Sequence, residues 1–323
     1  MSASEFDLIA RIRARLGAGG EGVRLGIGDD AALLAVPPGM QLAVTADTLN
    51  AGVHFPDATA PADIGWKALA VNLSDLAAMG ALPAWCTLAL SAPALDAAWL
   101  DGFLDGFCVL AGEHGVALVG GDTTRGPLSI SITAMGWLPA DAALRRDGAR
   151  VGDDVWVTGT LGDAAAALAH WLAGGEEALA GIPDLRDRLD RPTPRVVAGR
   201  ALLPLASAAA DVSDGLIADL GHICERSGVG AEVWVDALPA SSALGAMTAG
   251  VEERRRWQAT GGDDYELCFT AAPARREAIA EALAMAGTAA THIGRIVAGQ
   301  GVRAFTADNG EWQPPWRGFD HFA

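Results

Sequence analysis

The residues best suited to chemistry in this chain are aspartates in short segments bounded by glycine or hydroxyl residues. There are five such segments: residues 26–32 (GIGDDAA), 45–48 (TADT), 72–80 (NLSDLAAMG), 120–124 (GGDTT) and 211–215 (DVSDG). Hard cations such as Mg²⁺ take oxygen ligands and often share their shell with substrate phosphates, so these carboxylates indicate metal binding. The only lysine is Lys67. Any polyphosphate would therefore be neutralised by metal ions and arginines, and the first hypothesis is a Mg·nucleotide enzyme without a P-loop.

Several common nucleotide-binding motifs are excluded. The P-loop pattern G-x-x-x-x-G-K-[ST] requires a lysine that no glycine-rich segment of this chain supplies. The protein-kinase motif set requires a lysine and an H-R-D run, and GIGDDAA lacks the dinucleotide fingerprint G-x-G-x-x-G. A non-catalytic, Ca²⁺-binding acidic protein is the alternative from another class, but the EF-hand spacing D-x-[DN]-x-[DN]-G does not occur. Thermal stabilisation by nucleotide would separate the two.

Charge, hydropathy and cysteine spacing limit the partners and the compartment. With 40 acidic and 23 basic residues the net charge is −17, which disfavours nucleic acid and anionic membrane surfaces. No apolar run reaches the roughly 18–20 residues that span a bilayer, and the N-terminus lacks a signal-peptide layout. The four cysteines form no CxxC pair, which predicts reduced, mostly buried thiols in the cytoplasm: Cys86, Cys108, Cys224 and Cys268.

Hydrophobic periodicity predicts helices and strands in both halves of the chain. In the first half we expect helices over 4–16, 63–78 and 97–114, and strands over 40–49, 83–93, 117–124 and 128–139. Residues 23–36 are expected to form a strand, a loop and then a second strand that ends at Pro37–Gly39. In the second half we expect strands over 153–160, 208–214, 229–239, 261–271 and 291–297, and helices over 162–172, 195–205, 216–227 and 274–286. The pattern changes around 139–148. The chain is therefore expected to form two α/β or α+β domains, 1–140 and 141–323.

The acidic segments also have plainer interpretations. Asp29 and Asp30 could belong to a β-turn, since Asp and Gly are common turn residues, although several neighbouring carboxylates would repel one another without cations. Asn72 and Asp75 are at i and i+3 on a predicted helix and could serve one site, but Asp75 could instead be an ordinary exposed residue. His54 could contact a ligand or be structural.

Arginines and aromatic residues provide further candidates. Arg146 could contact phosphate, with Arg145 as the alternative. Asp214 and Gly215 lead into a helix whose N-terminus suits a phosphate group. The tail either seals a core or stacks on a heteroaromatic ring through its aromatic residues, Trp312, Trp316, Phe319 and Phe322.

The motif set resembles the thiamine-monophosphate kinase family, a branch of the aminoimidazole ribonucleotide synthetase superfamily. The similar segments, in chain order, are GIGDDAA, TADTL, AGVHF, DIGWKALAVNLSDLAAMGALP, GGDTTRGP, VTGTLGDA, RPTPRVVAG, DVSDGL and GGDDYEL. The resemblance implies a homodimer of two-domain subunits whose N-terminal sheets pair into a barrel. Residues 1–140 would bind metal and ATP and form the dimer, and 141–323 would complete the active-site cleft. The alternative is another ATP-using enzyme of this superfamily that acts on a different small molecule.

The same resemblance implies direct transfer of the ATP γ-phosphate to thiamine monophosphate, with no single residue acting as a base. Several Mg²⁺ ions would be held by Asp30, Thr45, Asp47, Asp75, Asp122, Asp211 and Asp214. ATP would contact Gly121, Asp122, Arg146 and Ser213, and the thiamine substrate would contact His54, Asp263 and Phe319. The chain departs from the family pattern at Asp263, where glutamate is usual, and at Ala46, where a hydroxyl residue is common.

Overall fold

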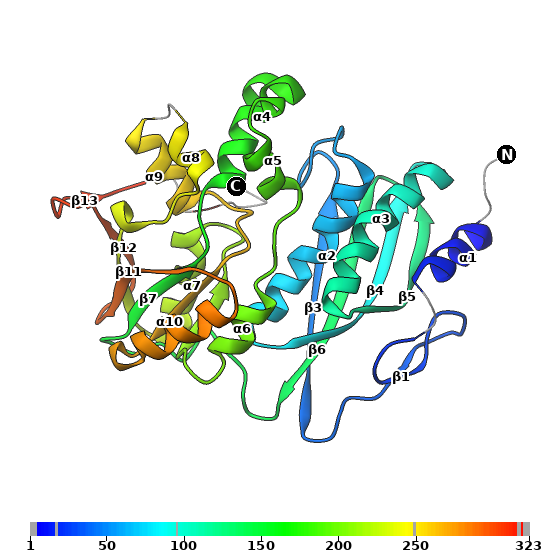
Figure 1. Cartoon of the computed structure of the whole chain (residues 1–323), viewed down its shortest axis with the longest axis horizontal. Coiled ribbons are helices and arrows are strands. Elements are labelled where there is room, and N and C mark those ends of the chain that lie inside the picture. Colours follow the sequence, from blue (N-terminus) through cyan, green and yellow to red (C-terminus); the bar gives the residue numbers. More distant parts are fainter. Residues whose placement is uncertain (1–4, 17–18, 95, 248–249, 315–317, 319–323) are drawn as a thin grey trace. The chain divides into compact units, whose positions relative to one another are not determined.

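The computed structural model describes residues 5–16, 19–94, 96–247, 250–314 and 318. The chain divides into two compact units, which are considered one at a time (Figure 1). The first unit comprises Met1–Leu76 and Ala81–Asp141, and the second comprises Ala77–Gly80 and Ala142–Ala323. Each unit contains helices and a mixed sheet, so the prediction of two domains that mix α and β structure is confirmed at this level.

The first unit is built on a four-stranded sheet in the order β3-β6-β4-β5. Strands β4 and β5 are parallel, and the other neighbours are antiparallel. Helices α2 and α3 cover one face of this sheet (Figure 1). The elements are α1 (Glu5–Leu16), β1 (Val23–Leu25), β2 (Leu33–Leu34), β3 (Met40–Asn50), α2 (Pro61–Ala78), β4 (Leu82–Ala92), α3 (Ala97–His114), β5 (Ala117–Arg125) and β6 (Ser129–Pro139).

Helices α2 and α3 approach each other closely because each presents a glycine at their crossing. A Cβ on Gly65 would lie 2.0 Å from the carbonyl oxygen of Phe103, and a Cβ on Gly106 would lie 1.8 Å from that of Ala62. Neither distance is possible for a real side chain, so the two glycines determine how α2 lies on the sheet. This matters for function because α2 carries Asn72 and Asp75.

The sheet face opposite α2 and α3 is covered only in part by other segments of the chain. At one end, Trp85 and Trp137 form an edge-to-face pair beneath the β1–β2 hairpin, and the Trp85 indole donates to the carbonyl of Glu21. Towards the β3 edge, alternate side chains are exposed, including Leu42 (46 %) and Val44 (58 %). Large apolar side chains rarely form a contiguous exposed strip unless another surface covers them.

The second unit contains a seven-stranded sheet in the order β13-β12-β9-β11-β7-β10-β8. Only the β12–β9 pair is parallel. The strands are β7 (Asp154–Thr158), β8 (Ala208–Asp211), β9 (Gly230–Trp234), β10 (Leu267–Ala271), β11 (Ala290–Val297), β12 (Gly301–Phe305) and β13 (Glu311–Trp312). The helices are α4 (Asp163–Ala180), α5 (Pro183–Asp190), α6 (Val196–Leu202), α7 (Leu216–Ser227), α8 (Ser242–Ala246), α9 (Val251–Thr260) and α10 (Arg276–Met285).

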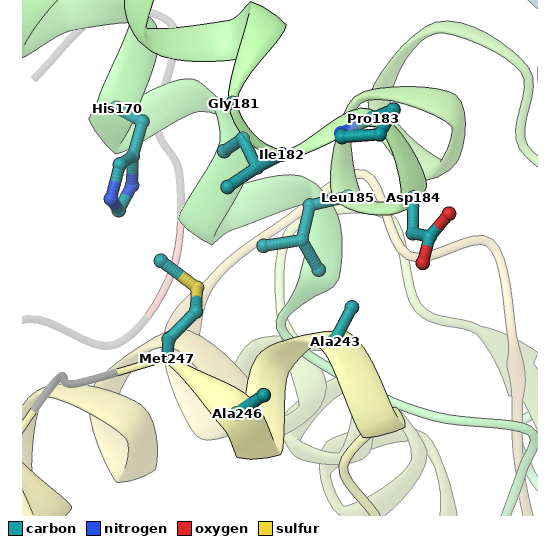
Figure 2. A pocket seen from close by; sticks show the side chains of 9 residues that line it. All are labelled: His170, Gly181, Ile182, Pro183, Asp184, Leu185, Ala243, Ala246 and Met247. Carbon is teal, nitrogen blue, oxygen red and sulfur yellow. The ribbon is translucent and has the colours of Figure 1, made fainter.

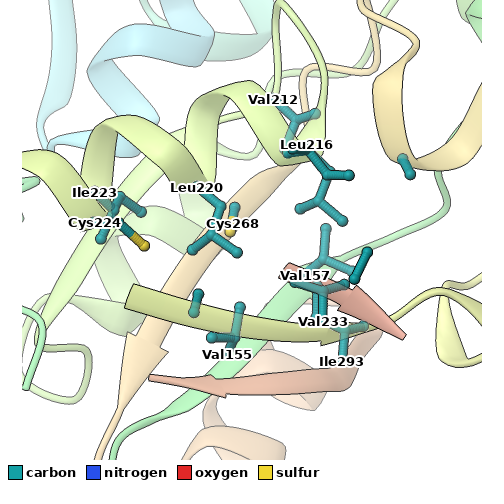
Figure 3. Close-up of a cluster of buried hydrophobic side chains, with 14 of the residues drawn as sticks. Val155, Val157, Val212, Leu216, Leu220, Ile223, Cys224, Val233, Cys268 and Ile293 are labelled. Carbon is teal, nitrogen blue, oxygen red and sulfur yellow. The ribbon is translucent and has the colours of Figure 1, made fainter. Parts of the chain in front are cut away.

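Helix α7 and the sheet enclose the main hydrophobic core of the second unit. Figure 3 shows Leu216, Leu220 and Ile223 of α7 facing Val155 and Val233 of the strands. All five side chains are fully buried. Burial of Leu, Ile and Val contributes roughly 1.5–3 kcal/mol per side chain. This core fixes the start of α7, which directly follows the DVSDG turn.

Several predicted elements are confirmed with their bounds, and others need correction. Helices 97–114 and 216–227 begin and end as expected. The strand predicted over 261–271 is wrong in its first half, since β10 begins only at Leu267. Asp263 and Tyr265 have positive φ angles, which no strand allows. The prediction also missed α5, α8, α9, β12 and β13.

No helix among the described residues is both long and apolar enough to cross a membrane. The prediction of free, mostly buried thiols is confirmed: all four cysteines are unpaired, and only Cys108 is partly exposed. Burial raises the pKa of Cys86 to about 12 and that of Cys224 to about 11. Burial also raises the pKa of the Cys268 thiol.

These thiols should be nearly inert in the folded protein, because the thiolate is the reactive form. With a disulfide reagent at about pH 8, we expect at most Cys108 to react in the native protein. All four cysteines should react after denaturation in guanidinium chloride. Rapid reaction of two or more thiols in the native state would contradict the burial described here.

Candidate active site

Strand β3 and helix α2 bring two of the predicted metal-binding carboxylates together. The Thr45 hydroxyl donates a hydrogen bond to Oδ2 of Asp75, and the backbone N–H of Asp47 donates to Oδ1 of Asn72 over 3.1 Å. The Asn72 side chain is fully buried, and its amide nitrogen donates to the carbonyl of Ala68 over 3.0 Å. Thr45, Asp47 and Asp75 therefore present oxygen atoms at one place, which suits a hard cation.

His54 closes a tight turn next to this cluster. Its Nδ1 accepts a hydrogen bond from the Asn50 N–H over 3.0 Å, and its own N–H donates to the Asn50 carbonyl over 3.0 Å. Because Nδ1 is an acceptor, the neutral ring carries its proton on Nε2 and can donate it to an anion. Sequence reasoning gave Lys67 no site role, yet its ammonium group, 2 % exposed, donates to the carbonyl of His54 over 3.1 Å.

Gly121 and Asp122 lie on β5, at the opposite edge of the sheet from β3. By register, Asp47 pairs with Ile132, Ile132 with Leu88, and Leu88 with Gly121. Three strand spacings separate the two edges by about 14 Å, so Asp122 does not join Asp47 and Asp75 within one chain. A Cβ on Gly121 would lie 1.9 Å from the Leu88 carbonyl oxygen, so only glycine fits there.

Asp30 is exposed in the loop between β1 and β2. Its backbone N–H donates to Oδ1 of Asp29 over 3.0 Å, and its own carboxylate lies at the surface. Among the residues that the structure describes, no group of three or more His, Cys, Asp or Glu side chains is arranged to hold a metal ion without further ligands.

In the second unit, the DVSDG turn is held by a residue that sequence reasoning did not single out. Oδ2 of Asp219 accepts hydrogen bonds from the N–H groups of Ser213, Asp214 and Gly215, at 3.1, 3.2 and 3.1 Å. Burial, and next the charge of Asp214, raise the pKa of Asp219 to about 7. An aspartate four residues after Gly215, in the first turn of the following helix, is the signal that could have indicated this role.

Asp263 lies beside this turn, which brings a predicted substrate contact next to a predicted ATP contact. The Asp263 N–H donates to the carbonyl of Ser213 over 2.8 Å. The hydroxyl of Tyr265, the only tyrosine in the chain, donates to Oδ1 of Asp263 over 2.9 Å. Asp211 is buried at the end of β8, immediately before the turn. Phe319 lies outside the described residues.

The structure separates the two candidate arginines. The Arg145 guanidinium forms a bidentate pair with Asp147, with Nε–Oδ1 and Nη2–Oδ2 distances of 2.9 and 2.5 Å. Arg146 accepts a hydrogen bond from Ser227 only through its backbone carbonyl, and its side chain is exposed. Of the two, Arg146 therefore has the side chain better placed to bind an anion.

A cavity of about 440 Å³ between α4, α5 and α8 is lined by none of these residues (Figure 2). It is lined mainly by apolar side chains, among them Ile182, Leu185 and Met247, with His170 at one side. The His170 ring is within hydrogen-bond distance of the carbonyl of Ala166. The cavity therefore contains few polar groups that could orient a ligand.

Comparison with known proteins identifies the family of this chain. Residues 28–138 match the AIR synthase related protein N-terminal domain, and residues 150–306 match the corresponding C-terminal domain. The thiamine-monophosphate kinase of Salmonella typhimurium is 49 % identical and aligns with 100 % of this chain and 99 % of its own length. The chain belongs to the thiamine-monophosphate kinase family.

Solved structures of thiamine-monophosphate kinases have the same fold. That from Stenotrophomonas maltophilia is 57 % identical, with a TM-score of 0.86 over 94 % of this chain and 97 % of the other. A structure described as AaThiL complexed with AMPPCP and TMP is 32 % identical, with a TM-score of 0.77 over 98 % and 97 % of the two chains. The family resemblance predicted from the sequence is thus confirmed end to end.

The position of Asp75 on α2, next to the Thr45–Asp47 stretch of β3, generates a prediction about Mg²⁺. Without the ion, Asp75→Asn should be at least as stable as the wild type, because it removes like-charge repulsion on the order of 1 kcal/mol. With saturating Mg²⁺, the wild type should gain melting temperature and the variant should gain much less. Thermal unfolding with and without Mg²⁺ tests this, with Asp57→Asn, an exposed aspartate of the same unit, as control. Equal Mg²⁺ stabilisation of all three proteins would rule out a cation at Asp75.

Proposed function

We propose that this protein is a thiamine-monophosphate kinase, which transfers the γ-phosphate of ATP to thiamine monophosphate and releases thiamine diphosphate and ADP. The observation that carries the proposal is the full-length match to kinases of this name, at 49 % identity over the whole chain. The related AaThiL structure was solved with AMPPCP and TMP, an ATP analogue and the proposed substrate.

The chemistry requires positioning more than a protein nucleophile. The attacking group is a phosphate oxygen of thiamine monophosphate, which is already anionic near neutral pH, so no side chain has to remove a proton. Phosphoryl transfer proceeds through a loose transition state in which alignment and charge neutralisation supply most of the catalysis. Thr45, Asp47 and Asp75 fit this need, because they offer oxygen ligands for a cation and do not form a catalytic triad.

Magnesium ions bound here would neutralise the ATP phosphates and bring them into line with the acceptor. In this proposal the ions are held by Asp30, Thr45, Asp47, Asp75, Asp122, Asp211 and Asp214. ATP contacts Gly121, Asp122, Arg146 and Ser213, and thiamine monophosphate contacts His54, Asp263 and Phe319. The Nε2–H of His54 suits the substrate phosphate, because an imidazole N–H is a good donor to a phosphate oxygen.

The protein acts as a homodimer in this proposal, with the uncovered sheet faces of two copies forming a closed barrel. Two observations support it. The exposed strip that includes Leu42 and Val44 would be buried by a second sheet. By register, Asp122 lies in the same row as Ala89, Ser131 and Thr48, on that uncovered face. Asp122 would therefore lie at the dimer contact, whereas Asp47, in the neighbouring row with Ile132, lies on the α2 face.

We also propose a cytoplasmic location, since four free cysteines suit a reducing compartment.

The two domains have different roles in this proposal. Residues 1–140 supply the dimer contact and most metal ligands. Residues 141–323 supply Arg146, Asp211, Ser213, Asp214 and Asp263.

The proposal is tested by separating the products of thiamine monophosphate, ATP and Mg²⁺ by chromatography. We expect equal amounts of thiamine diphosphate and ADP, and no product from unphosphorylated thiamine. Release of ADP without thiamine diphosphate would keep the nucleotide site and assign the chain a different acceptor. Absence of both products would reject the proposal.

Complementation between inactive variants tests whether the site is shared between the two chains of the dimer. Asp47→Asn and Asp122→Asn should each lower kcat by about 100-fold or more, because each removes charge stabilisation of the transition state. If each site takes Asp47 from one chain and Asp122 from the other, co-expressed variants should recover about a quarter of wild-type activity. Half of the dimers are then mixed, and each mixed dimer has one intact site. No recovery in mixed dimers isolated with two affinity tags would place both residues in a single-chain site.

A further inference from the structure

Three motifs of the second unit converge on one buried carboxylate to which the proposed function gives no role. The segments VTGTLGDA, RPTPRVVAG and GGDDYEL contribute Thr158, Arg195 and Glu266, respectively. Glu266 is completely buried, in a chain where most acidic residues are at the surface. A buried carboxylate is costly unless it is paired and fully hydrogen-bonded.

Each carboxylate oxygen of Glu266 accepts two hydrogen bonds from side chains. Arg195 binds them in bidentate fashion, with Nε–Oε2 and Nη2–Oε1 distances of 2.6 and 2.5 Å. Arg188 of α5 donates to Oε1 over 2.9 Å, and the Thr158 hydroxyl donates to Oε2 over 2.7 Å. A Cβ on Gly159 would lie 2.1 Å from Oε1, so glycine is required there to admit the carboxylate. Burial alone would lower the pKa of Arg195, but the hydrogen bonds and the charge of Glu266 raise this pKa above its usual value.

The backbone around Glu266 is tied to the two turns that carry proposed site residues. The Val212 N–H donates to the Glu266 carbonyl and the Tyr265 N–H donates to the Val212 carbonyl, both over 2.8 Å. One residue further out, the Asp263 N–H donates to the Ser213 carbonyl. The side chain of Glu266 therefore anchors this series of backbone hydrogen bonds, which holds Asp263 against the DVSDG turn.

The segment between Gly262 and Leu267 requires such an anchor. Asp263 and Tyr265 have φ angles of 66° and 50°, a conformation that non-glycine residues rarely adopt. Each such residue costs on the order of 1 kcal/mol and persists only where its surroundings over-determine it. Arg188 adds to this constraint, because its Nη2 also donates to the carbonyl of Asp264 over 3.2 Å.

We propose that Glu266, held by Arg195, Arg188 and Thr158, is a positioning residue that sets the place of Asp263 and thereby the affinity for the phosphate acceptor. The inference rests on the proposed function, in which Asp263 contacts thiamine monophosphate. The Ser213 turn has its own anchor in Asp219, whose carboxylate binds three of its N–H groups. Loss of the Glu266 cluster should therefore affect the acceptor more than ATP.

The test is steady-state kinetics of Glu266→Gln and Glu266→Asp, with each substrate varied in turn. For both variants the KM for thiamine monophosphate should rise about 10-fold or more, since small misplacements of binding groups have effects of this size. The KM for ATP should stay within about twofold. Glu266→Asp keeps the charge and shortens the side chain by one methylene, so it reports position and not charge; it also serves if Glu266→Gln fails to fold.

Arg276→Met is the matched control. Arg276 also makes a bidentate pair with a buried carboxylate, that of Asp154 in the same unit, with Nε–Oδ2 and Nη2–Oδ1 distances of 2.6 and 2.8 Å. It should leave both KM values unchanged. Equal changes in both KM values, or an unchanged acceptor KM, in folded Glu266 variants would overturn the inference while the proposed function stands. A wild-type enzyme that does not convert thiamine monophosphate would overturn both.

Discussion

Carboxylates taken out of bulk water must have their position and charge supported by neighbours, and the candidate site depends on this constraint throughout. The Thr45 hydroxyl donates a hydrogen bond to Asp75, and the Tyr265 hydroxyl donates one to Asp263. The side-chain oxygen of Asn72 accepts a hydrogen bond from the backbone N–H of Asp47. The supporting group lies on another element for Asp75 and Asp47, and two residues further along the same segment for Asp263. The acidic residues are thus held in place before any ligand arrives, which reduces the ordering needed when one binds.

The two units hold their acidic residues by different means. In the first unit, strand register and the close crossing of α2 and α3 place the side chains, so geometry comes from packing at Gly65 and Gly106. In the second unit, two irregular turns are held by buried carboxylates, Asp219 and Glu266, that accept hydrogen bonds from N–H groups and arginines. A strand gives a fixed direction to each side chain. A turn with positive φ angles can bring two backbones closer, but it requires dedicated anchors.

Local sequence patterns predicted the regular elements well and the irregular ones poorly. The strand over 117–124 and the helix over 216–227 were found because apolar periodicity and turn glycines agree there. Helix α9, VEERRRWQAT, was missed because five of its ten residues are charged and it shows little apolar periodicity. The prediction of a strand before Leu267 is wrong because positive φ angles at Asp263 and Tyr265 leave no mark in composition. The role of Glu266 depends on contacts with segments far away in the sequence, and one sequence cannot reveal it.

Lys67 is the only lysine in the chain, so its position decides whether an ammonium group can bind a phosphate. Its ammonium group is buried and bound to the carbonyl of His54, so the only lysine supports a turn and is not offered to a phosphate. ATP carries several negative charges, and a site rich in aspartate on a protein of net charge −17 would repel it. Divalent cations remove this repulsion from both partners at once, whereas an added lysine would neutralise only one charge. In the proposed function, an acidic site of this kind would select the metal complex of the nucleotide, because the free nucleotide and the empty carboxylates repel each other.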